Sequence, residues 1–170
     1  MKRIFLLLVV LSTIFLNSCA KDVARSISVE EVNGVVQVSN AKGEMDAYVG
    51  ERLMSGDDVK VDVDSNMTLL IDSDKHLFAD AGTHFSLEAT GKEKSTKTRI
   101  NLYEGSALFG IDNKLKADEF YEVDTPNATM AVRGTVFKVK YVTLGITTVE
   151  VIDGEVEATC QSLDGENTVL

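Results

Sequence analysis

His76 and His84 are the two histidines of the chain and the side chains best suited to act as general bases near neutral pH. Each lies in a short stretch that is typical of a strand, and no G-x-S-x-G segment supplies a nucleophile for a catalytic triad. The two histidines have no H-x-H spacing, which disfavours a metal site of the cupin kind. We therefore predict hydrogen-bonded structural histidines, and no catalytic residue, metal or cofactor.

Aspartates recur between positions 57 and 74 and raise the question of a calcium site. A calcium loop needs converging oxygen ligands, a glycine for its tight turn and a later glutamate, and Asp72-Ser73-Asp74 lacks the last two. We interpret these aspartates as turn formers or solvent-facing strand residues. They are Asp57, Asp58, Asp62, Asp64, Asp72 and Asp74.

Cys19 follows a segment typical of a bacterial lipoprotein signal. Lys2 and Arg3 precede the apolar run 4–16, which is shorter than the roughly 20 residues that span a bilayer as a helix. Residues 16–19, L-N-S-C, resemble a lipobox, from which Asn17 departs. We predict a signal peptide at 1–18, lipidation of Cys19 and a tether at 19–26. A plain secretory signal and an N-terminal transmembrane helix are the alternatives.

The net charge of −10 argues against nucleic acid as a partner, because an acidic protein releases no counterions from phosphates. The balance suits a domain held near a membrane by lipid. Ala20 follows the lipobox cysteine where some bacteria use aspartate for inner-membrane retention, which favours the outer membrane. Cys160, the other cysteine, is interpreted as a small strand residue.

Arg133 stands where an alternating apolar pattern changes phase. Apolar residues at 128, 130 and 132 share one parity and those at 137, 139 and 141 share the other, so one straight strand would expose one set. Gly134 lies at the break and can adopt positive φ without strain. The pattern predicts two short strands that meet at Arg133-Gly134.

Two roles are open for the Arg133 side chain. It could present its guanidinium to the carboxylate of a partner. Alternatively, it could satisfy carbonyls freed by the bend or pair with Asp124. The same segment includes Thr135 and Phe137.

The remainder of the chain, from Ile27, predicts an all-β fold. Short alternating stretches are separated by glycine or Asn/Asp turns, and such strands bury one face each by packing as two sheets. Asx-Gly and Glu-Gly pairs predict three tight hairpins, residues 113–119 predict a short helical turn, and 91–99 predict a charged hairpin tip. The domain is expected at 27–160 and a C-terminal tail at 161–170. The three hairpin pairs are Asn33-Gly34, Glu104-Gly105 and Asp153-Gly154.

The chain resembles the FecR domain, a bacterial extracytoplasmic module, over roughly 32–158. The resemblance rests on Thr125-Pro126, the core A-V-R-G-T-x-F at 131–137, an early G-x-x-L-x-x-G-D at 50–57 and a closing V-x-V-x-x-G-x-V at 149–156. It implies an antiparallel two-sheet sandwich of jelly-roll or β-helical character. It also implies that Arg133, Gly134, Thr135 and Phe137 form a partner-binding or structural hallmark.

Together with the lipid anchor expected at Cys19, the resemblance implies a non-enzymatic domain that works through an envelope protein partner, as scaffold, sensor or signalling accessory, with no small-molecule substrate. FecR-type regulators carry a cytoplasmic anti-sigma segment and a transmembrane helix ahead of the domain; here a signal peptide is expected instead, which disfavours direct sigma-factor control. The alternative function is binding of carbohydrate or cell-wall polymer. Its aromatic platforms would be Tyr48, Tyr103 and Tyr121.

Overall fold

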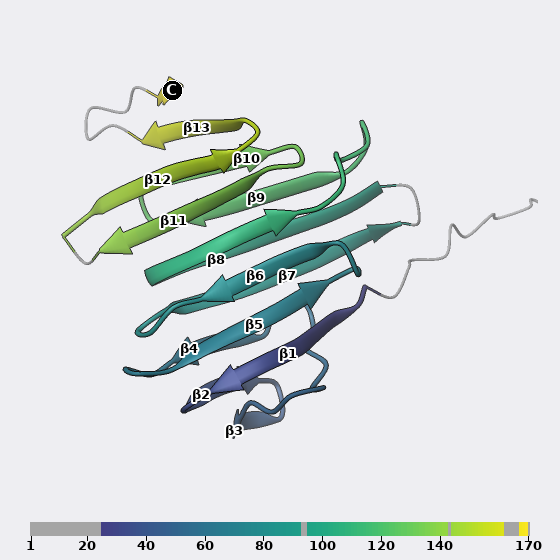
Figure 1. Cartoon of the computed structure of the whole chain (residues 1–170), viewed down its shortest axis with the longest axis vertical. Coiled ribbons are helices and arrows are strands. Elements are labelled where there is room, and N and C mark those ends of the chain that lie inside the picture. The colour runs from purple at the N-terminus through teal and green to yellow at the C-terminus, as the bar shows by residue number, and fades with distance from the viewer. Residues whose placement is uncertain (1–24, 93–94, 143, 162–166, 170) are drawn as a thin grey trace, which may run out of the picture.

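The computed structural model describes residues 25–92, 95–142, 144–161 and 167–169, and this part of the chain is all-β, as predicted. The strands form two layers that share one long strand, β8 (Ser95–Ile111). The first layer, in front in Figure 1, also contains β1 (Ile27–Asn33), β5 (Asn66–Ile71), β6 (Lys75–Ala79), β11 (Val136–Val142) and β12 (Ile146–Asp153). The second layer contains β2 (Val36–Asn40), β3 (Gly43–Asp46), β4 (Asp58–Val61), β7 (His84–Lys92), β9 (Phe120–Thr125), β10 (Ala128–Val132), β13 (Val156–Gln161) and β14 (Asn167–Val169).

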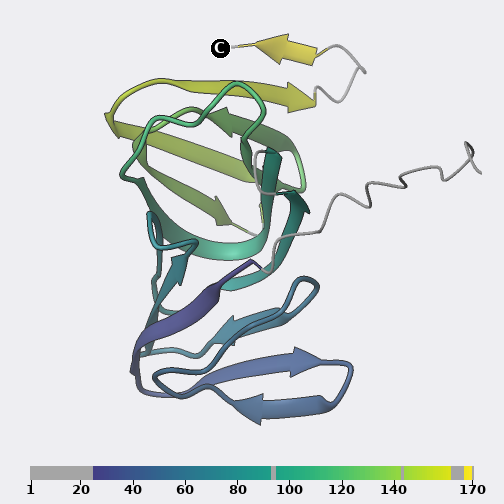
Figure 2. The same ribbon diagram turned by 90° about the vertical axis from the view of Figure 1, so that its right-hand side faces the viewer.

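The expected sandwich is therefore present, but its two sheets are continuous through β8. The first part of β8 pairs with β7 and β9 in the second layer, and its last part pairs with β6 and β11 in the first. Almost all pairs are antiparallel, as expected, whereas β8 and β9 run parallel. Figure 2, at right angles to Figure 1, shows the sheet curling around the interior.

The chain passes from one layer to the other at corners, and these corners lie on two opposite sides of the sandwich. The register of β6 and β7 on β8 puts Ala79 opposite Ala107 and His84 opposite Glu104, so the corner at 80–83 lies beside Gly105. β11 starts with Val136 opposite Gly110, so the corner at Gly134 lies at the other end of β8's last part. The first side holds the corners at 33–35, 62–65, 80–83 and 104–105, and the opposite side those at 133–135 and 154–155.

The three predicted hairpins are wrong, because all three glycine pairs are corners. β1 and β2 lie in different layers, as do β12 and β13, and Glu104-Gly105 lies within β8. Positive φ serves a layer change as well as a chain reversal, so the dipeptide does not distinguish the two. The stacking of corners adds a steric reason for glycine: a Cβ on Gly105 would lie 2.5 Å from Thr83 Cα.

The core lies between the layers and is centred on aromatic side chains from both. The Phe109 and Phe137 rings stack with centroids 5.0 Å apart, and Tyr121 meets Phe109 edge-on at 6.4 Å. On β5 the alternate side chains at 67, 69 and 71 are buried. Val63 follows the alternation of Val59 and Val61 but is exposed, because the chain has already entered the corner.

The connection at 112–119 contains no helix, so the predicted helical turn is wrong. A single turn at Ala117-Asp118 is closed by a hydrogen bond from the Glu119 amide to the Lys116 carbonyl, 3.0 Å. Leu115 is the one buried residue of this connection, and one apolar contact does not require a helical stripe. The charged tip at 91–99 is a β7–β8 hairpin, as predicted. Among the described residues, no helix has the length and apolar character needed to cross a membrane.

Candidate functional site

Gly134 is the corner between β10 and β11, and its conformation accounts for the change of phase in the sequence. It has φ +77°, which a glycine adopts without strain. On one side of it Met130 is buried and on the other Phe137 and Val139 are buried, because the two strands lie in different layers. The prediction of two strands meeting at Arg133-Gly134 is confirmed.

The Arg133 side chain is exposed, and its Nε donates a hydrogen bond to the Leu115 carbonyl, 3.3 Å. This contact resembles the expected capping of a free carbonyl, since it joins the corner to the connection between β8 and β9. Asp124 is not its partner: that carboxylate lies 3.1 Å from Arg99 Nε. The terminal nitrogens of Arg133 form no hydrogen bond or ion pair within the described residues.

Thr135 directs its hydroxyl into the neighbouring corner. Oγ1 donates to the Glu155 carbonyl at 2.8 Å, and the Thr135 carbonyl accepts from the Ile111 amide at 3.1 Å. The side chain is buried, so these bonds satisfy groups that water does not reach. Thr135 thereby links β11, the end of β8 and the β12–β13 corner.

A shallow depression of about 540 Å³ lies over these corners. The hallmark residue Phe137 is absent from its lining because the ring lies in the core. The depression presents two cationic side chains and one carboxylate. It is lined by Lys114, Arg133, Gly134, Gly154 and Glu155.

These contacts occur within the segment that matches a known family. The family described as FecR protein matches residues 55–157, well over half of the chain. The chain belongs to the FecR family. No curated protein and no solved structure matches the chain. FecR domains are associated with signalling and with proteins of the cell envelope.

The FecR match begins after Gly50 and Leu53, which lie in the early motif identified from the sequence. Both nevertheless have defined places in the fold. The Gly50 amide donates to the Val29 carbonyl at 2.8 Å, and Leu53 is buried against the core. Asp57, also in that motif, accepts a hydrogen bond from the Met54 amide at 2.8 Å through Oδ2.

The histidines of the FecR domain are hydrogen-bonded to carboxylates, as predicted. His84 Nε2 lies 2.9 Å from Asp58 Oδ2, and His76 Nε2 lies 3.3 Å from Asp112 Oδ2. The described residues contain no group of three or more side chains arranged to hold a metal ion.

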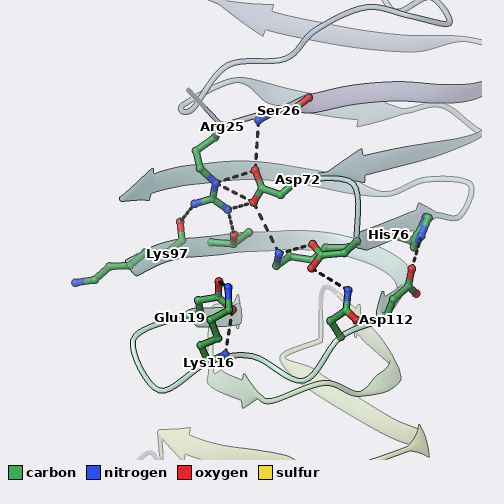
Figure 3. Close-up of polar contacts among 12 residues, drawn as sticks. Arg25, Ser26, Asp72, His76, Lys97, Asp112, Lys116 and Glu119 are labelled. Carbon is green, nitrogen blue, oxygen red and sulfur yellow. Dashed lines mark hydrogen bonds and ion pairs between the residues drawn. The ribbon is translucent and has the colours of Figure 1, made fainter. Parts of the chain in front are cut away.

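Arg25 forms a polar cluster that sequence reasoning missed. Its Nε donates to Asp72 Oδ2 at 2.8 Å and Nη2 forms an ion pair with the same carboxylate (Figure 3). Nη1 donates to the carbonyls of Thr90 and Lys97, at 2.6 and 2.9 Å, and Nη2 donates to Thr98 Oγ1 at 2.7 Å. Arg25 is thus fixed to the β5–β6 turn and to β7 and β8.

Two of the aspartates considered for calcium have cationic partners here. Asp72 binds Arg25, and Asp74 pairs with Lys75 at 2.6 Å, with the Lys75 side chain 5% exposed. Arg25 and Ser26 were expected to be tether, but the Ser26 carbonyl already accepts from the Asp72 amide at 2.8 Å. Cys19 and the predicted signal peptide lie outside the described residues.

The structure leaves fewer of the three tyrosines accessible as aromatic platforms for a carbohydrate. Tyr121 is 1% exposed and belongs to the core, so its assignment as a platform is wrong. Tyr103 is partly covered by His84, with ring centroids 4.8 Å apart, and Tyr48 is exposed on a separate loop.

Cys160 lies half-buried in β13 as a free cysteine.

Proposed function

We propose that this FecR domain is a lipid-anchored, extracytoplasmic module without enzymatic activity that acts by contacting another envelope protein. The proposal rests on the structural roles of the residues that form the family's hallmark. Gly134, Thr135 and Phe137 form a corner, an internal hydrogen bond and part of the core, so they build the fold. The hallmark leaves a surface around Arg133 for contact.

The Arg25 cluster supports an arrangement close to a membrane. Arg25 is six positions after Cys19, and six extended residues span at most roughly 20 Å. Because Arg25 is fixed to the β5–β6 turn, a lipid on Cys19 would hold the domain within that distance of the bilayer. An anchored domain of this kind would meet membrane-bound partners without long-range diffusion.

Lipid labelling tests the anchor. The full chain, expressed in bacteria fed a radiolabelled or alkyne-tagged fatty acid, is expected to incorporate the label, and Cys19→Ala is expected to lose it while Cys160→Ala retains it. Absence of label in the unaltered chain would overturn the anchor. Separation of inner and outer membranes on a density gradient then tests the outer-membrane prediction.

Crosslinking in cells tests the contact function. Photo-crosslinking residues are placed singly at exposed positions on different faces, such as Tyr48, Phe78 and Arg133. A discrete adduct from one face, identified as an envelope protein, supports the proposal. If no position gives an adduct with an envelope protein and the domain binds specifically on a glycan array, the carbohydrate alternative is favoured.

A further inference from the structure

The two ends of the sandwich differ in how their edge strands are covered. At the N-terminal end, residues 50–53 run along the outer edge of β1. The Val29 amide donates to the Glu51 carbonyl at 2.9 Å and the Leu53 amide donates to the Ile27 carbonyl at 3.0 Å. Leu53, 3% exposed, closes the core beside Ile27 and Val29, which are each 2% exposed. This end is sealed by an extended segment that adds one apolar side chain.

The C-terminal end has no such cover within the described residues. β12 pairs with β11 on one edge, and no described backbone group is hydrogen-bonded along its other edge; the Thr147 side chain, near the start of β12, contacts Thr125 and Asn127. Figure 1 shows β12 as the last strand of the front layer. Val151, whose neighbour on β11 is Phe137, is 46% exposed, and Val149 and Val156 are partly buried. An unpaired edge beside open core is a template for a further strand.

The charge of this end restricts the charge that an added strand can carry. Four acidic side chains lie along β12, the following corner and β13, and none forms an ion pair within the described residues; the one at the corner shares its depression with Lys114 and Arg133, whereas those on β12 do not line it. A second copy of the chain would bring the same acids and a net charge of −10 against them. A basic segment would be attracted. The four acids are Glu150, Asp153, Glu155 and Glu157.

We propose that the free edge of β12 binds an extended, positively charged segment of a partner protein by strand addition. The segment pairs with the β12 backbone, inserts apolar side chains beside Val151 and Val149, and places lysine or arginine near Glu150 and Asp153. It covers this end as residues 50–53 cover the edge of β1. The inference rests on the proposed function, because it specifies the chemistry of the partner.

Hydrogen exchange of the full chain in non-ionic detergent tests the proposal with defined peptides. The probe is an eight-residue peptide that alternates valine and lysine. One control peptide replaces lysine with glutamate, and the other has a central proline that interrupts the strand. The valine–lysine peptide is expected to slow exchange of amides in 146–153, and neither control is expected to do so.

Two variants separate the contributions of charge and edge. Glu150→Lys with Asp153→Lys should weaken binding of the valine–lysine peptide by about tenfold or more. Val151→Lys places a charge at the open core and should abolish the protection, as inward charges block edge pairing. Lys42→Glu, on the loop after β2, is the matched control and should leave the protection unchanged. The thermal midpoint of each variant shows whether it is folded.

Each remaining outcome overturns the proposal. Absence of protection in β12, or equal protection by the glutamate or proline peptide, excludes strand addition by a basic segment. Protection of β12 that rises with protein concentration and needs no peptide assigns the edge to a second copy instead. Labelled Cys19 and crosslinks from other faces would leave the proposed function intact while this inference fails.

Discussion

Gly154 lies directly against Gly134: a Cβ on Gly154 would come 2.9 Å from the Gly134 carbonyl oxygen and 3.0 Å from Thr135 Oγ1. The closing motif and the R-G-T hallmark therefore meet in space. Both glycines have positive φ, at +91° and +77°, so each corner needs a glycine for its own conformation as well as for the contact.

Comparing Gly134→Ala with Gly145→Ala separates the need for positive φ from the need for space at the corner contact. Gly134 and Gly145 have nearly the same φ, +77° and +79°, but a Cβ would lie 2.8 Å from Lys114 Cα at Gly134 and in open space at Gly145. We expect Gly145→Ala to cost about 1 kcal/mol of unfolding free energy from backbone strain, and Gly134→Ala about 2–4 kcal/mol. Urea denaturation measures both. Equal losses would show that the corner contact adds nothing.

Thr135→Val tests the bond between the corners. Valine keeps the shape of threonine but cannot donate to the Glu155 carbonyl, now 2.8 Å from Oγ1. The unfolding free energy should fall by about 1–2 kcal/mol, because the donor is buried. Thr148→Val on exposed β12 is the control, with an expected change within about 0.5 kcal/mol. A silent Thr135→Val would mean that the carbonyl finds another donor.

Arg25 is expected to matter through its shape as well as its charge. Arg25→Ala should lower the unfolding free energy by about 2–3 kcal/mol, since Asp72 and two carbonyls each lose the hydrogen bonds that Arg25 donates. Arg25→Lys should recover less than half of this loss, because one ammonium cannot reach all of these acceptors. Amide exchange at residues 72–75 should quicken in both. Exposed Arg52→Ala serves as control, and full recovery by lysine would contradict the geometry.

Tyr121 predicts a fall in stability at high pH. Burial raises the pKa of this phenol above its ordinary value of 10.0, and its hydroxyl has no hydrogen-bond partner within the described residues. The folded state therefore holds its proton where the unfolded state loses it, so the Tyr121 contribution is full below pH 10 and falls as pH rises further. Tyr121→Phe should remove this fall and cost nothing, or gain up to about 1 kcal/mol, at pH 7.

Denaturant midpoints between pH 8 and 11.5 measure this dependence. Tyr48→Phe, at an exposed tyrosine, should retain the alkaline fall of the unaltered chain. An alkaline fall that persists unchanged in Tyr121→Phe would assign it to other groups.

The phase change at Gly134 could be predicted from the sequence because burial leaves few choices: alternating residues on both sides of the glycine each need a core. The corners could not be distinguished from hairpins, since local turn chemistry at Gly34, Gly105 and Gly154 is compatible with both. Pairing decides between them, and pairing depends on contacts far apart in sequence. Tyr121 shares its parity with Val123, and this alternation is the sequence signal that favours its burial over a role as an exposed platform.

The Arg25 cluster could not be predicted from the sequence. Its acceptors lie 47 to 73 positions away, and nothing around Arg25 distinguishes it from a linker cation. The exposed end at β12 could not be predicted either. Val151 alternates like any inward residue, and its exposure depends on which strand is last in the layer.

The single 17-residue strand β8 has a consequence for how the molecule melts. In a solenoid of independent coils, terminal coils can fray while the middle persists. Here the two halves of the chain hydrogen-bond to the same strand, through β6 and β7 on one side and β9 and β11 on the other. Loss of β8 removes the support of both halves at once, so the domain should unfold as one cooperative unit.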